Sequence, residues 1–78
     1  MNSMLPLRAL REAEALADLG RVAEALARLD EAQHALTQLP NDPWRLGVLR
    51  LRASLVDGPQ AAELRRQAGA LADKLGMA

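Results

Sequence analysis

Small and large apolar residues alternate at helical spacing on both sides of one glycine, and this pattern constrains the fold more than any other feature. The pattern comprises Ala13, Leu16, Gly20, Val22, Ala25, Leu29 and Ala32. Glycine readily adopts the left-handed conformation that ends many helices, which a Cβ atom disfavours. Apolar residues three or four apart lie on one side of a helix. The segment therefore predicts two helices that pack together across a turn at Gly20.

The apolar half of the 78 residues is almost entirely Ala, Leu and Val, with no Phe or Tyr and one Trp. Ala and Leu favour helices, whereas strands favour β-branched and aromatic residues. A chain of this length has room for one core. We therefore expect an all-α fold in a single helical domain over residues 1–78.

Glycine and proline divide the chain into four segments with helical periodicity. We expect helices over about residues 6–19, 22–39, 43–56 and 59–75. Asp42 is placed to cap the third helix with Pro43 at its first position, and Asn2 or Ser3 to cap the first. The helices form two stacked antiparallel hairpins, over about residues 6–39 and 43–76.

The third segment has a wider apolar surface than the others. Its main stripe is Trp44, Val48, Leu51 and Leu55, and Leu46 and Leu49 extend the apolar surface beyond that stripe. One helix face covers one neighbour, so a wider surface requires a second. We expect this helix to lie between two neighbours.

Two features repeat along the chain with the same spacing, which is typical of helical-repeat proteins. Gly20 and Gly58 are related by a shift of 38 residues, as are Leu26 and Leu64. Together with the apolar pattern around Gly20, residues 19–26 resemble the turn of a tetratricopeptide repeat. Residues 65–77 are similar to the closing helix of longer repeats in large bacterial regulators. This resemblance implies a tetratricopeptide-like stack of hairpins that binds proteins.

A narrower resemblance concerns the second half of the chain. Pro43 and Trp44 open a helix, Leu51 and Arg52 follow, and the last helix is rich in leucine. This order is similar to the C-terminal half of the tetratricopeptide-like needle chaperones of type III secretion. The resemblance implies a chaperone that holds an aggregation-prone helical subunit before export.

No residue pattern for catalysis or for metal or cofactor binding is present. His34 is the only histidine, and the chain lacks cysteine. Asp30, four residues before His34, offers half of a metal site, but we interpret His34 as an exposed residue beside an acid. Glycine-rich phosphate loops, serine elbows and zinc-ligand spacings are also absent from the sequence. We therefore expect no enzyme activity, no cofactor and no metal.

The charge balance and hydropathy argue against nucleic-acid and membrane partners. Ten basic and ten acidic residues give a net charge of zero, without the basic excess that phosphate or anionic lipid attracts. No segment has the roughly 18 uncharged apolar residues of a membrane span, and the opening residues do not match a signal peptide. We expect a cytoplasmic protein.

The predicted function is non-catalytic: a protein-interaction module, small chaperone or adaptor. The candidate partner-binding residues are Trp44, Arg45, Leu49 and Arg52, together with Leu10 and Leu26 as candidates for exposed apolar residues. Arg45 and Arg52 are seven residues apart on one helix face, where they are placed to hold carboxylates of a partner. Trp44 has two interpretations, an anchor between helices or a partner contact. The alternative function is a structural homo-oligomeric bundle, in which the partner is a second copy of the chain.

Overall fold

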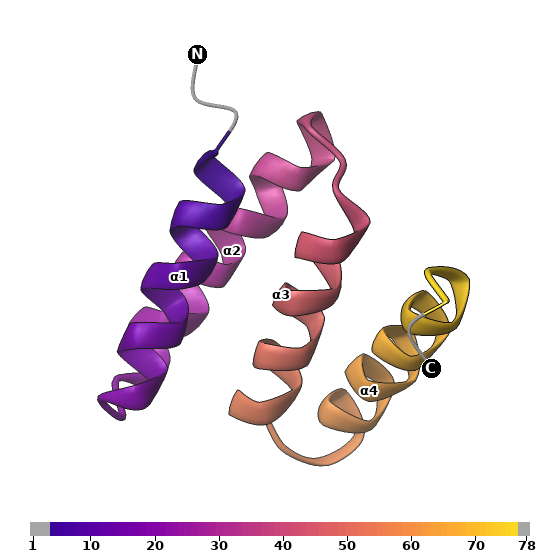
Figure 1. Cartoon of the computed structure of the whole chain (residues 1–78). Helices are drawn as coiled ribbons and strands as arrows, with labels where there is room; N and C mark the ends of the chain where they lie inside the picture. The colour runs from indigo at the N-terminus through magenta and orange to yellow at the C-terminus, as the bar shows by residue number, and fades with distance from the viewer. Residues whose placement is uncertain (1–3, 77–78) are drawn as a thin grey trace.

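The computed structural model describes residues 4–76, which form four helices (Figure 1). They are α1 (Leu5–Asp18), α2 (Val22–Gln38), α3 (Asp42–Leu55) and α4 (Gly58–Lys74). The first helix of each hairpin has 14 residues and the second has 17. No strand occurs among the described residues, so the all-α prediction is confirmed. The predicted helix ends differ from the observed ones by at most one residue.

Gly20 ends α1 as the sequence predicts. Its φ of +77° lies in the left-handed region, where a Cβ atom would be strained. The Arg21 N–H donates to the Leu16 carbonyl oxygen at 2.9 Å, and the Gly20 N–H donates to Ala17 at 3.0 Å. These two bonds form a Schellman motif, which satisfies carbonyl groups that the end of the helix leaves unpaired. The turn is therefore fixed by its backbone.

Asn41, and not Asp42, caps α3, which corrects the prediction. The Trp44 N–H donates to Asn41 Oδ1 at 3.0 Å, and Asp42 is the first helical residue. Asn and Asp cap helices about equally well, so residue type did not distinguish these neighbours. The other predicted caps, Asn2 and Ser3, lie outside the described residues.

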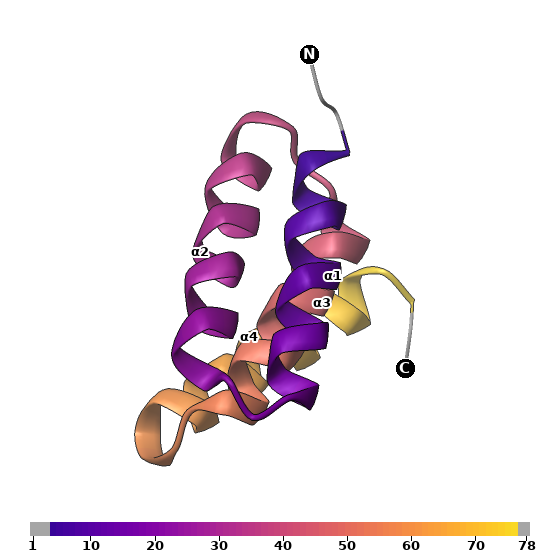
Figure 2. The ribbon, with the colours of Figure 1, turned by 90° about the vertical axis from the view of Figure 1, so that its left-hand side faces the viewer.

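The larger of two buried clusters joins α1, α2 and α3. Its buried members are Ala9, Leu10, Ala13, Leu29, Ala32, Leu36 and Val48. Half-buried Trp44, Leu51 and Leu55 of α3 pack against this cluster. Figure 2 shows α1 and α2 side by side in the first hairpin. The predicted main stripe of α3 therefore faces the first hairpin.

The smaller cluster joins α3 to α4. It consists of buried Leu46, Ala68 and Ala72, with half-buried Leu49, Leu71 and Leu75 packed against them. No Cα atom of α4 lies within 8 Å of a Cα atom of α1 or α2. In Figure 1, α3 accordingly lies between the first hairpin and α4. The prediction that α3 has two neighbours is confirmed.

Gly47 permits a close approach between α3 and α1. A Cβ atom at this position would lie 2.9 Å from Cδ2 of Leu10, closer than packed carbon atoms approach. Leu10 is only 7% exposed there. The missing side chain of Gly47 thus makes room for a core leucine.

Candidate functional site

A groove lies between α2 and α4, with α3 as its floor. Its volume is about 390 Å³, within the usual range of ligand pockets. The apolar lining residues are Leu36, Val48, Leu49, Ala70 and Leu71. The polar lining residues are Gln33, Thr37, Arg45, Arg66 and Gln67. The groove therefore combines an apolar surface with polar side chains from all three helices.

The groove exists because α4 packs against α3 alone. No other helix fills the space between α4 and α2 on this side of α3. Both α2 and α3 line it with residues at positions i, i+3 and i+4, namely 33, 36 and 37 on α2 and 45, 48 and 49 on α3. Residues with this spacing cover about one helical turn. The groove is therefore about one turn long.

Among the described residues, two arginines and no carboxylate line the groove. Arg66 Nε lies 2.8 Å from Glu63 Oε2, one turn earlier on α4. The hydrogen bond from Arg66 lowers the pKa of Glu63, and the same bond raises the pKa of Arg66. Arg45 is exposed and forms no ion pair with any residue in the described part of the chain. Arg45 is thus the groove's uncompensated positive charge.

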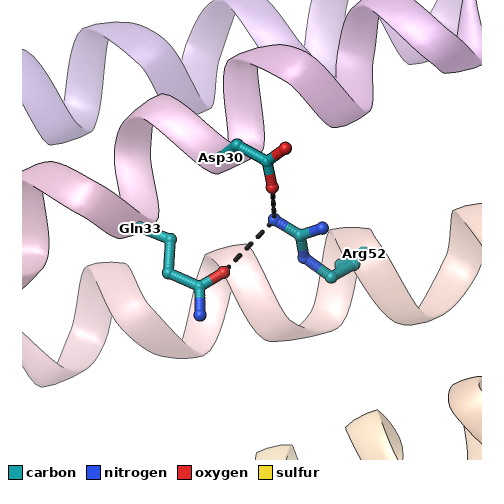
Figure 3. Close-up of polar contacts among 3 residues, drawn as sticks. All are labelled: Asp30, Gln33 and Arg52. Atoms are coloured by element: carbon teal, nitrogen blue, oxygen red, sulfur yellow. Dashed lines mark hydrogen bonds and ion pairs between the residues drawn. The ribbon is translucent and has the colours of Figure 1, made fainter.

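Arg52 joins α3 to α2, so of the two predicted partner-binding arginines only Arg45 is without an ion pair among the described residues. The Arg52 Nη2 atom lies 2.7 Å from Asp30 Oδ1 and 3.2 Å from Gln33 Oε1 (Figure 3). The Arg52 side chain is only 16% exposed, whereas that of Asp30 is 72% exposed. Spacing along α3 does not reveal this interaction, because both partners belong to another helix.

The remaining predicted partner-binding residues divide between the groove and the core. Leu49 is half-buried and lines the groove. Trp44 is half-buried against the larger cluster, as its interpretation as an anchor requires. Leu10 and Leu26 were expected to be exposed, and this was wrong. Leu10 is buried, and Leu26 is half-buried against the same cluster, because α3 covers the first hairpin.

The groove also contains residues that sequence reasoning did not select. Val48 was predicted only as part of a helix stripe, and Leu36, Arg66 and Leu71 were not predicted as site residues. Their helical spacing identifies each stripe but not which stripes remain uncovered. That information comes from the placement of α4.

A second and more open hollow, of about 450 Å³, lies between α3 and α4. Its lining residues are Arg50, Ala53, Ser54, Arg65, Ala68 and Gly69. A Cβ atom at Gly69 would meet nothing within 4 Å. The hollow reflects the small side chains with which these two helices face each other.

Residues 4–76 show neither a cluster of metal ligands nor a helix suited to span a membrane. Within residues 4–76, no three His, Cys, Asp or Glu side chains are grouped to hold a metal ion. His34 is exposed on α2, where its carbonyl oxygen accepts a hydrogen bond from Thr37 Oγ1 at 2.6 Å. None of the helices in this range has the length and hydropathy needed to cross a membrane.

Comparison with protein-family models, with curated proteins and with solved structures found no match to this chain. The resemblances to tetratricopeptide repeats and to needle chaperones therefore stay predictions.

Proposed function

We propose that this chain is a non-catalytic protein-interaction module that holds a segment of another polypeptide in the groove between α2 and α4. The observation that carries the proposal is the apolar surface that half-buried Leu49 of α3 and half-buried Leu71 and exposed Ala70 of α4 leave open in the groove. Helical grooves with apolar floors bind amphipathic peptides, whose apolar side chains replace water there. An adaptor or a small chaperone uses such a groove in the same way.

The proposal is tested by selecting binders from a phage-displayed library of random 16-residue peptides on the immobilised chain. We expect enriched peptides whose binding is blocked by A70W, because Ala70 is exposed and lines the groove. The matched control is A62W, since Ala62 is also exposed on α4 but lies outside the groove. Peptides that bind A70W and A62W equally well, or no enrichment over the bare support, would overturn the proposal.

A second copy of the chain is the alternative occupant. Large apolar residues are exposed near the ends of the helices, among them Leu5, Leu19 and Leu39. Light scattering over a concentration series measures self-association directly. A dimer that A70W dissociates and A62W does not would assign the groove to a second copy. A monomer at all concentrations favours a different polypeptide.

A further inference from the structure

We propose that the groove binds one turn of an acidic amphipathic helix from another protein, with two apolar side chains on its floor and a carboxylate at Arg45. This inference rests on the proposed function and specifies the partner. It follows from the size of the groove, from its charge and from the pairing of the surrounding ionic residues.

The size of the groove limits what enters it. The lining residues of α2 and α3 cover about one helical turn. A partner helix presents apolar side chains on one face at positions i and i+3 or i+4. Two such side chains, one turn apart, match the apolar surface that Leu49, Ala70 and Leu71 leave open in the groove.

The positive charge of the groove favours a partner helix with an acidic residue beside its apolar face. The whole chain carries equal numbers of acidic and basic residues, yet the groove lining has arginines and no carboxylate. Glu63 balances Arg66, and Arg52, which does not line the groove, is paired with Asp30. Arg45 alone keeps an unpaired guanidinium among the lining residues, and guanidinium groups bind carboxylates through two parallel hydrogen bonds.

The fold leaves Arg45 available because the nearby acid is already engaged. Asp42 lies one turn before Arg45 on α3 and is positioned to pair with it. Instead, Asp42 Oδ2 lies 3.5 Å from Lys74 Nζ at the end of α4. The contact between α3 and α4 thus pairs the carboxylate one turn before Arg45 with Lys74.

The test uses the same phage-displayed peptides with charge-reversal variants. We expect the enriched peptides to contain Asp or Glu beside two apolar residues three or four apart. R45E should weaken binding at least tenfold. R8E is the matched control, because Arg8 is exposed, lies on α1 outside the groove and is unpaired among the described residues. R8E should leave affinity within twofold of the wild type.

Charge exchange on the peptide completes the test. Replacing the acidic residue by Lys should weaken binding to the wild type and strengthen binding to R45E. Peptides that A70W blocks but that lack acidic residues, or that bind R45E and wild type alike, overturn this inference and leave the proposed function standing. A failure to enrich any peptide overturns both.

Discussion

The two hairpins share helix lengths but differ in how their second helices are buried. Residues Val22 and Gly58, which begin α2 and α4, are 36 residues apart. With this shift, buried Ala25 and Ala32 of α2 correspond to buried Ala61 and Ala68 of α4. The two helices differ at the positions where α2 has large buried leucines. At the position of Leu29, α4 has Arg65, and at the position of Leu36 it has Ala72.

This difference explains why the groove is beside α4. Helix α2 packs against both α1 and α3, and its leucines fill the space between them. Helix α4 packs against α3 alone, and its fully buried apolar residues are alanines. Alanine allows close contact but buries little apolar area, so α4 is held by a smaller hydrophobic contribution. The second hairpin therefore has the weaker core and the open surface.

The largest expected effect is the loss of a core leucine from the first hairpin. Leu29 is fully buried, so L29A should destabilise the protein by about 2–5 kcal/mol through lost burial and a residual cavity. The matched change L75A, at a half-buried position of α4, should cost less than half as much. Urea unfolding followed by circular dichroism measures both. Equal losses would show that the two cores contribute equally.

Amide hydrogen exchange compares the local stability of α2 and α4 in the unmodified protein. A helix with one neighbour opens locally at lower free energy than one packed on two sides. We expect central amides of α4 to exchange at least tenfold faster than those of α2, equivalent to about 1.4 kcal/mol. Native-state exchange monitored by NMR resolves the individual amides. Equal protection in α2 and α4 would contradict the weaker attachment of α4.

The Arg52–Asp30 pair lies at the junction between the hairpins. Its contribution to the free energy of unfolding should be smaller than that of the core leucine. R52A should destabilise by about 1 kcal/mol, because the largely buried Arg52 side chain links α3 to Asp30 and Gln33 of α2. A double-mutant cycle with D30A should give a coupling of about 0.2–1 kcal/mol, because Asp30 is mostly exposed. The exposed pair Arg11–Glu14 is the control, with weaker expected coupling. Stronger coupling in the control pair would argue against a role at the junction.

The smallest expected effects come from the two glycines inside helices. G69A should stabilise the protein by about 0.5–1 kcal/mol, because a Cβ atom there meets no neighbour and alanine favours helix. G47A gains the same propensity but pushes against Leu10, so it should stabilise less or destabilise. The melting temperatures of the two variants, measured by thermal unfolding, compare these changes in stability. A larger gain from G47A than from G69A would contradict the close α1–α3 contact.

Much of the fold follows from local patterns in the sequence. Apolar spacing located all four helices, Gly20 fixed the first turn, and the wide apolar surface of α3 implied two neighbours. The sequence predicted a repeat with a shift of 38 residues from its glycines, whereas α2 and α4 begin 36 residues apart. The glycines differ because Gly20 precedes α2 by two residues, while Gly58 is the first residue of α4.

The candidate site was only partly predictable. Arg45 and Leu49 were selected from the sequence and line the groove, but Leu36, Arg66 and Leu71 were not selected for it. That Arg45 and Arg52 together hold a partner's carboxylates stays a prediction, and the sequence did not reveal that Arg52 binds Asp30 and Gln33 on α2. Its partners are separated from it by 22 and 19 residues, beyond the range of helical spacing.

The sequence by itself determined where helices begin and end and which face of each is apolar, because these depend on residues within a few turns of one another. Only the tertiary structure decided which apolar faces are covered. Leu10 is buried because Gly47 admits α3 to it, and Leu49 lines a groove because α4 packs on α3 alone. Both outcomes depend on contacts between helices, which the periodicity of a single helix does not encode.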